Sequence, residues 1–304
     1  MNIELSIIIV SYNVCDYLQK CIKSIFDAKI NHAFEIIVID NNSTDESSSK
    51  IRGEFSSIIW IQNIKNIGFA AANNQGINQS KGQFILLLNP DTEVKPGAIE
   101  ALLQVMVDDP SIGACGSKLV NQDGSLQLSC YPFPTLGNEL IRLHHLEKLF
   151  PQTQYPMDEW NKNLFYPVDN IQGASLLLRK ASLDEVGLLD ESFFIYTEEV
   201  DLNYRLKKAG WKNLYVPTSE VVHFGGQSTK QNKTEMFLEL YKAKIQFFRK
   251  HYGAMKTNFY KFMLFETSLM RIFVGKILNV FQNTTDRQML IKNYSNLIRK
   301  LSSF

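Results

Sequence analysis

The sequence predicts an α/β protein built on a doubly wound, mostly parallel sheet flanked by helices, with a helical extension at the C-terminal end. Short apolar runs rich in β-branched residues lie at 5–10, 35–40 and 83–88, as in strands buried on both faces. Segments with helical periodicity separate these runs. Strands that alternate with helices form βαβ units with right-handed crossovers, which build a parallel sheet. Beyond Met236 the pattern is helical to the end of the chain.

The strand at 5–10 is followed by an amphipathic helix. Asn13 is a candidate N-cap, with Asp16 three residues later. Apolar positions then recur every three or four residues, as on one buried helix face. These positions are Val14, Tyr17, Leu18, Cys21, Ile22 and Ile25.

The next elements follow the strand at 35–40. Ser43 and Glu46 have the spacing of a capping box, which predicts a second helix running towards Arg52. A further strand is expected at 58–62.

Small residues between Gly68 and Gly76 permit a helix to pack closely on the sheet, and this segment ends before the strand at 83–88. Pro96 suits the first turn of another helix that runs to Val107.

The alternation of strands and helices stops between 130 and 167, where prolines punctuate an aromatic-rich segment with one helix near 137–149. A loop this long and apolar is typical of a substrate lid or an acceptor groove, and a simple packing excursion is the alternative. A strand returns at 171–179, and a helix extends from Glu198 to Gly210.

Length and composition favour a soluble globular enzyme, because 304 residues of 45% hydrophobic content can bury a substantial core. The 32 basic and 31 acidic residues give a net charge of +1, which provides no global field for nucleic acid. The four cysteines form no CxxC pair, and we expect them to be buried thiols in a reducing cytoplasm. The N-terminal segment lacks the features of a signal peptide, so a location inside the cell is expected.

Two strands end on a polar turn that carries a carboxylate. Asp40 ends the strand at 35–40, and Asp91 directly follows the strand at 83–88. Ligands of open α/β sheets bind just beyond the carboxyl ends of the strands, so these acids predict a site for a metal or a phosphate group. Neither GxGxxG after the first strand nor GxxxxGK[ST] anywhere is present, which disfavours dehydrogenases and P-loop kinases.

A third acidic cluster begins the helix at 198. Thr197 is a candidate cap, and acids in a first helical turn complement the helix dipole without any catalytic role. Adjacent carboxylates such as Glu198 and Glu199 also disfavour joint ionisation, which moves one of them towards the pKa of a general base. Glu199 is the candidate base, and the purely structural alternative stays open.

Five separated motifs together resemble family 2 inverting glycosyltransferases of the GT-A fold, and most closely their rhamnosyltransferase-like branch. The resemblance covers residues 3–255 and rests on the order, spacing and strand-end placement of the motifs. These motifs are the opening run 6–13, the turn 38–45, the segment 66–76, Asn89-Pro90-Asp91 and the cluster 198–202.

The resemblance implies a donor site at the first two strand ends. Asp40 matches the aspartate that binds the pyrimidine base, and the turn at 11–13 lies where the base and sugar of the nucleotide are held. The implied donor-binding residues are Ser11, Tyr12, Asn13, Asp40, Asn42 and Asn89.

The resemblance also implies a divalent metal, Mg²⁺ or Mn²⁺. Asn89-Pro90-Asp91 stands in the place of the DxD motif, but its first acid is an amide here. Asp91 is then the retained carboxylate ligand, with diphosphate oxygens and water completing the shell. His223 matches a histidine that reaches the metal or the diphosphate, and a satisfied turn histidine is the alternative reading.

On the acceptor side, Glu199 takes the position where the family usually has aspartate, and it is the implied catalytic base. Gly173 and Ala174 resemble the turn at which acceptor and donor sugar approach, and Glu198 is expected beside them. The implied reaction is a single in-line displacement, which needs no covalent nucleophile.

These features predict a cytoplasmic, membrane-peripheral glycosyltransferase. It would move a sugar, such as L-rhamnose from dTDP-rhamnose or a sugar from a UDP donor, to a cell-surface glycan or lipid-linked acceptor. A nucleotidyltransferase is the nearest alternative, although such enzymes normally carry a glycine-rich basic loop after the first strand. A nucleotide-sugar-binding protein with weak or no catalysis is the other alternative, because Asn89 and Glu199 replace the usual acids.

Three regions are expected. Residues 1–125 form the donor-binding half, 126–235 the acceptor-binding half of the same domain, and 236–304 the helical extension. Charged residues interrupt the dense apolar positions of the extension before any run reaches the roughly 18 residues of a spanning helix. The extension therefore lies on a membrane surface, or packs on the domain or on a second subunit in a homodimer.

Overall fold

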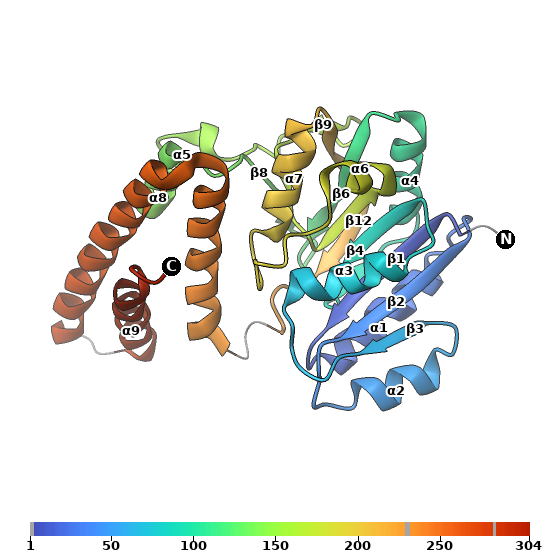
Figure 1. Cartoon of the computed structure of the whole chain (residues 1–304), viewed down its shortest axis with the longest axis horizontal. Coiled ribbons are helices and arrows are strands. Elements are labelled where there is room, and N and C mark those ends of the chain that lie inside the picture. Colours follow the sequence, from blue (N-terminus) through green and yellow to red (C-terminus); the bar gives the residue numbers. More distant parts are fainter. Residues whose placement is uncertain (1–2, 229–231, 282–283) are drawn as a thin grey trace. The chain divides into compact units, whose positions relative to one another are not determined.

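The computed structural model describes residues 3–228, 232–281 and 284–304, and these form two compact units (Figure 1). Of the described residues, the first unit contains 3–133, 155–194 and 198–228, and the second contains 134–154, 195–197, 232–281 and 284–304.

Within residues 3–228, ten strands form the sheet of the first unit, with the central order β3-β2-β1-β4-β11-β6-β12-β5. β7 pairs with β6, β9 pairs with β12, and β8 (Cys130–Tyr131) and β10 (Asn170–Ile171) form a separate antiparallel pair. The strands of the sheet are β1 (Leu5–Ser11), β2 (Phe34–Asp40), β3 (Ile59–Gln62), β4 (Phe84–Leu88), β5 (Thr92–Val94), β6 (Ile112–Val120), β7 (Leu126–Gln127), β9 (Tyr166–Pro167), β11 (Ser175–Arg179) and β12 (Lys212–His223).

The expected mostly parallel core is confirmed on the N-terminal side of the sheet. β1 is parallel to both β2 and β4, and β2 is parallel to β3. β11 then runs antiparallel between β4 and β6, and β12 is parallel to β6. The sheet is therefore mixed where the second half of the chain joins it.

Helices cover both faces of this sheet. One hydrophobic cluster joins Ile7 and Ile9 of β1 to α1, α2 and α4, and the other joins Ile8 and Val10 to α3, α6 and α7. The first strand is thus buried on both faces, as its unbroken apolar run predicts. The helices are α1 (Cys15–Asp27), α2 (Ser47–Glu54), α3 (Phe69–Gln79), α4 (Ala98–Asp108), α6 (Lys180–Val186) and α7 (Glu198–Lys208).

The two predicted helix caps at the sheet edge are wrong. α1 begins at Cys15, because Asn13 has a φ of 53° and its side-chain oxygen accepts from the Thr44 backbone N–H instead. α2 begins at Ser47, and Ser43 donates its hydroxyl to Asp40 rather than capping the helix. Both polar side chains hold the turns of the sheet edge together.

Other boundaries also differ from the predictions. Pro96 precedes Gly97, the residue before α4, so it is not in the first helical turn. The expected strand at 171–179 is divided into β10 and β11 by the turn at Gly173. Three of the four thiols are buried as expected, whereas Cys15 is half-buried. Burial raises the pKa of Cys21 and Cys130 to about 12, which makes both thiols inert.

The second unit is helical. It contains α5 (Leu136–Leu143), the short 3₁₀ helix η1 (Pro151–Thr153), α8 (Lys233–Phe281) and α9 (Thr285–Lys300). The predicted helix near 137–149 therefore ends earlier than expected. Gly253, at φ 80° and ψ 175°, divides α8 into two arms. None of the helices described in this structure combines the length and apolarity needed to cross a membrane.

A buried carboxylate lies in the core of the second unit. Glu139 on α5 accepts a hydrogen bond from Lys244 at 2.8 Å and from the hydroxyl of Tyr260 at 3.1 Å. Arg142 lies 3.3 Å from the other oxygen of the same carboxylate. Burial raises the pKa of Glu139, but these partners outweigh it and leave the pKa below its ordinary value. α5 and the first arm of α8 are thereby joined by an ion pair.

Candidate active site

The carboxyl ends of β1 and β2 place two predicted donor-binding residues opposite each other, because Ser11 and Asp40 are register partners. Asp40 is 1% exposed, and its carboxylate accepts from the Ser43 backbone N–H at 3.3 Å and from Gln62 Nε2 at 2.5 Å. The buried Ser11 hydroxyl makes no hydrogen bond with the described residues. An unsatisfied buried hydroxyl at this edge is available to a ligand.

The neighbouring turns are tied to each other. The Asn13 backbone N–H donates to Ser43 Oγ at 2.9 Å, and Asn42 has a φ of 68° in the same turn region. Tyr12 is half-buried beside them, and Asn42 is exposed. A cavity of about 400 Å³ is lined by Asn13 together with Gln227. The predicted donor turn therefore borders an open space.

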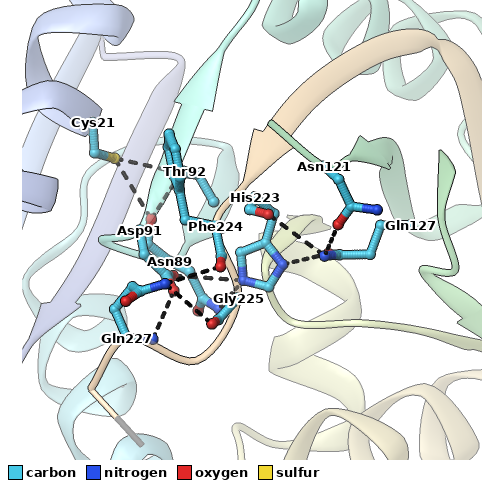
Figure 2. Close-up of polar contacts among 10 residues, drawn as sticks. All are labelled: Cys21, Asn89, Asp91, Thr92, Asn121, Gln127, His223, Phe224, Gly225 and Gln227. Atoms are coloured by element: carbon cyan, nitrogen blue, oxygen red, sulfur yellow. Dashed lines mark hydrogen bonds and ion pairs between the residues drawn. The ribbon is translucent and has the colours of Figure 1, made fainter. Parts of the chain in front are cut away.

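Asp91 lies at the end of β4 and is 5% exposed (Figure 2). One carboxylate oxygen accepts the Gln227 backbone N–H at 3.1 Å, and the other lies 3.5 Å from His223 Nε2. Burial raises the pKa of Asp91, but His223 and the Gln227 N–H outweigh this effect and leave the pKa below its ordinary value. Asp91 is thus a carboxylate at neutral pH.

Two hydrogen bonds to the Asn89 carbonyl stabilise the turn that carries Asp91. The Asn89 carbonyl accepts from the Thr92 hydroxyl at 2.7 Å and from the buried Cys21 thiol at 3.6 Å (Figure 2). The Asn89 side-chain amide faces His223 Nε2 at 3.4 Å. The structure therefore brings Asn89, Asp91 and His223 together, although 134 residues separate the first and last of them.

A glutamine fixes the tautomer of His223. Gln127 Nε2 donates to Asn121 Oδ1 at 3.1 Å and to the His223 carbonyl at 3.5 Å, which turns Gln127 Oε1 towards the imidazole (Figure 2). His223 Nδ1 lies 2.5 Å from that oxygen and must donate to it. His223 therefore carries a proton on Nδ1 in either charge state: a protonated ring donates from Nε2 to Asp91, whereas a neutral ring presents the lone pair of Nε2 towards it.

The donor set at this point suits a hard divalent ion. Within residues 3–228, 232–281 and 284–304, no group of three or more His, Cys, Asp and Glu side chains is placed to hold a metal. The imidazole of His223 and the carboxylate of Asp91 supply two donor atoms, so an ion would take its remaining ligands from a diphosphate and water. The hydrogen bond on the far ring nitrogen of His223 is the usual partner of a metal-binding histidine.

The predicted base lies at the start of α7. Glu198 is 4% exposed, and its burial, followed by the charge of Glu199, raises its pKa well above the ordinary value. This shift favours the neutral form of Glu198, whereas Glu199 is half-buried. Tyr196 and Thr197 both have a φ of 69°, so Thr197 lacks the extended backbone usual for an N-cap. Positive φ in a β-branched residue is strained.

Buried polar side chains anchor α7. Asn203 Nδ2 donates to the Ile171 carbonyl at 3.2 Å and to the Glu199 carbonyl at 2.7 Å. Asp201 is fully buried and accepts from Arg205 Nε at 2.8 Å. Arg205 also donates to the Val186 carbonyl at 2.6 Å. Asp201 is thus committed to the fold.

Gly173 and Ala174 connect the two groups of residues. A Cβ built on Gly173 would lie 3.8 Å from Glu199 Cβ and 3.8 Å from the ring of Phe69. The next residue, Ala174, accepts the Asn89 backbone N–H at 3.0 Å. A series of neighbouring residues therefore connects Glu199, through Gly173 and Ala174, to the Asn89–Asp91 turn at one edge of the sheet.

The sequence did not reveal three residues of this site. Gln127 orients His223, Asn121 orients Gln127, and Gln227 donates its backbone N–H to Asp91. Each polar contact joins residues that are remote in sequence or belong to loops with no recognisable pattern. Two consecutive glycines before Gln227, at φ 70° and 66°, were the available signal of a tight ligand-binding turn.

An α/β sheet with polar and acidic residues beyond its strand ends is a ligand-binding architecture of the nucleotide-binding type. Residues 6–186 match the family Glycosyl transferase family 2, and the chain belongs to this family. The N-acetylglucosaminyl-diphospho-decaprenol L-rhamnosyltransferase of Mycobacterium tuberculosis is 30% identical over 75% of this chain and 78% of its own. The low-salt glycan biosynthesis hexosyltransferase Agl10 of Haloferax volcanii is 26% identical over 78% and 72%.

Solved structures confirm the GT-A fold. The mannosyltransferase PcManGT of Pyrobaculum calidifontis, in complex with GDP-Man and Mn²⁺, aligns with a TM-score of 0.58 at 12% identity. It covers 98% of this chain and 86% of its own. GalNAc-T7 with UDP, GalNAc and Mn²⁺ aligns with a TM-score of 0.56 at 19% identity, over 73% of this chain and 44% of its own.

Proposed function

We propose that this glycosyltransferase is an inverting enzyme that moves L-rhamnose from dTDP-rhamnose to a glycan on a lipid-linked acceptor. The identity of the sugar and the acceptor is supported by the rhamnosyltransferase relative at 30% identity. The proposal also places the reaction in the cytoplasm, at the inner face of the cell membrane, where such an acceptor is accessible. The donor-binding half is 1–125 and the acceptor-binding half 126–235.

One observation supports the mechanism: Gly173 lies between Glu199 and the Asn89–Asp91 turn. Because Gly173 has no side chain, the position that a Cβ would take, 3.8 Å from Glu199 Cβ and 3.8 Å from the ring of Phe69, is space that an acceptor would occupy. An acceptor hydroxyl in this space would meet a base on one side and the donor turn on the other. Such positioning supplies much of the rate in a one-step displacement.

In the proposed step the Glu199 carboxylate takes the proton of the acceptor hydroxyl while that oxygen attacks the anomeric carbon. The bond from the anomeric carbon to the diphosphate oxygen breaks, and the nucleoside diphosphate leaves with the electron pair. Neutral Glu198 leaves Glu199 as the acceptor of this proton, because one proton stays on the buried member of the pair.

Asp91 and His223 would hold a divalent ion, Mg²⁺ or Mn²⁺. Such an ion neutralises charge on a leaving diphosphate. Ser11, with its unsatisfied hydroxyl, and Asp40 at the facing strand end would bind the nucleoside, beside Tyr12, Asn13 and Asn42.

The test is a panel of nucleotide sugars, each offered with Mn²⁺ and with EDTA. We expect dTDP-rhamnose to raise the melting temperature more than UDP- or GDP-sugars, with about 2.7 kcal/mol of stabilisation at 100 times its dissociation constant. Transfer to a lipid-linked N-acetylglucosamine acceptor is then followed by chromatography. Stabilisation without transfer would identify a nucleotide-sugar-binding protein, and formation of a nucleotide sugar from dTTP and a sugar phosphate would identify a nucleotidyltransferase.

A further inference from the structure

The second arm of α8, residues 254–281, is apolar on two opposite faces. Its inward face contributes Tyr260, Met263 and Leu264 to the hydrophobic core of the second unit. Gly275 lets α9 approach on this side, since a Cβ there would lie 3.0 Å from Ile291. The arm therefore packs on α9 through this face (Figure 1).

The outward face presents a continuous apolar stripe, which we call the α8 ridge. Its members recur every three, four or seven residues, which keeps them on one side of a helix. Phe262 and Phe273 are 62% and 65% exposed, and Val280 is 82% exposed. The ridge extends over about 32 Å, from 1.5 Å of rise per residue. Its members are Phe259, Phe262, Leu269, Phe273, Ile277 and Val280.

Charge is distributed unevenly along the chain and is concentrated around this ridge. The arm that carries the ridge, residues 254–281, contains four basic residues and one acidic residue, a net charge of +3, whereas the whole chain has +1. Lys256 and Lys276 are exposed on the same arm. Glu266 is the one acid of the arm, and its carboxylate lies 3.6 Å from His144 Nε2. The surroundings of the ridge are thus strongly basic.

We infer that the α8 ridge binds the surface of an anionic lipid bilayer, with the arm lying in the plane of the membrane interface. Phenylalanine side chains would enter the boundary between headgroups and acyl chains, while Lys256 and Lys276 would meet anionic headgroups. A second copy of the chain is the less favourable occupant, because two arms that each carry a net charge of +3 repel each other. If the proposed function holds, a lipid-linked acceptor would be met at this surface, and this part of the inference rests on that function.

Vesicle flotation of the full chain tests the inference without any transfer assay. We expect binding to vesicles of phosphatidylcholine with 30% phosphatidylglycerol, weak binding to phosphatidylcholine alone, and loss of binding as salt rises, because the attraction is screened. Phe262→Gln/Phe273→Gln should weaken partitioning by more than about tenfold. Lys256→Gln/Lys276→Gln should weaken it by about 25-fold, at about fivefold for each charge.

Matched controls lie on the first unit. Ile64 and Val107 are exposed apolar residues, and Lys20 and Lys23 are exposed lysines. Ile64→Gln/Val107→Gln and Lys20→Gln/Lys23→Gln should float as the wild type does. All variants should keep the wild-type melting temperature and its increase with donor nucleotide, which shows that they are folded.

Two results would overturn the inference. The first is equal flotation of the ridge variants and the controls. The second is a wild-type chain that ignores anionic vesicles and sediments as a dimer, with Phe262→Gln/Phe273→Gln restoring the monomer, which would assign the ridge to a second copy. Failure of sugar transfer alone would contradict the proposed function and leave vesicle binding unchanged.

Discussion

Replacing Gln127 by leucine removes the oxygen that accepts the Nδ1 proton of His223, 2.5 Å away. His223 is 5% exposed, so bulk water does not take over as the acceptor. The imidazole is then free to carry its proton on Nε2 and to direct it at Asp91, 3.5 Å away. The two proposed metal ligands would then bind each other instead of an ion. Partners of this kind contribute about 10- to 100-fold to metal affinity, or about 1.4 to 2.7 kcal/mol.

Two measurements report the effect of Gln127→Leu. Calorimetric titration of Mn²⁺ in the presence of dTDP gives the affinity, and long-range ¹H–¹⁵N spectra of the metal-free protein give the tautomer of His223. Gln104→Leu, on the exposed side of α4, is the matched control and should change neither. Wild-type Mn²⁺ affinity together with an unchanged Nδ1–H tautomer in Gln127→Leu would refute the reasoning.

Four further substitutions test these assignments. Glu199→Gln should lower the rate of transfer by about 10²- to 10⁴-fold with donor affinity unchanged, and a wild-type rate in steady-state assays would move the base to Glu198. Asp91→Ala and EDTA should both remove the metal-dependent part of dTDP-rhamnose affinity in calorimetry. Asp40→Ala should weaken the affinity for pyrimidine donors with or without metal. Activity that survives both Asp91→Ala and EDTA would exclude the metal. Because the pKa of Glu198 is raised in the native state, the native chain keeps a proton that the unfolded chain releases above the ordinary pKa of 4.5. The contribution of Glu198 to the free energy of unfolding is therefore full below that pH and falls as pH rises. Urea denaturation of Glu198→Gln should therefore show a gain over wild type that grows from about pH 5 to pH 8, and a pH-independent difference would mean that Glu198 is ionised.

The strands that were predicted from the sequence are those with uninterrupted apolar runs, such as β1 and β4. β12 escaped prediction because Pro217 and Glu220 interrupt its pattern, and its register with β6 shifts between Val216 and Glu220. β6 contains Gly113 and Gly116, which weaken a strand pattern. Gly116 is required by packing, since a Cβ would lie 2.1 Å from Ile171. Tertiary contacts therefore decided elements that local propensity left ambiguous.

The site was predictable to the extent that its residues end recognisable strands. Asp40 and Asp91 were proposed as site residues in this way, and Glu199 by its place at a helix start. The role of Asn13 and Ser43 was misassigned, because a short polar side chain before a helix can satisfy either the helix end or a neighbouring turn. Gln127 was not predictable, since its function depends on a contact with His223, 96 residues away.

The antiparallel direction of β11 has a consequence for how specificity can change. A parallel strand would bring its carboxyl end to the edge where Asp91 lies, whereas β11 brings its amino end there, so that Gly173 and Ala174 enter the edge from the opposite chain direction. The proposed donor and acceptor residues therefore lie on loops that leave and enter the sheet separately. Insertions before β11 can remodel the acceptor side while the register of β1, β2 and β4 is preserved. A sheet of this kind permits a lineage to exchange acceptors without redesigning nucleotide recognition.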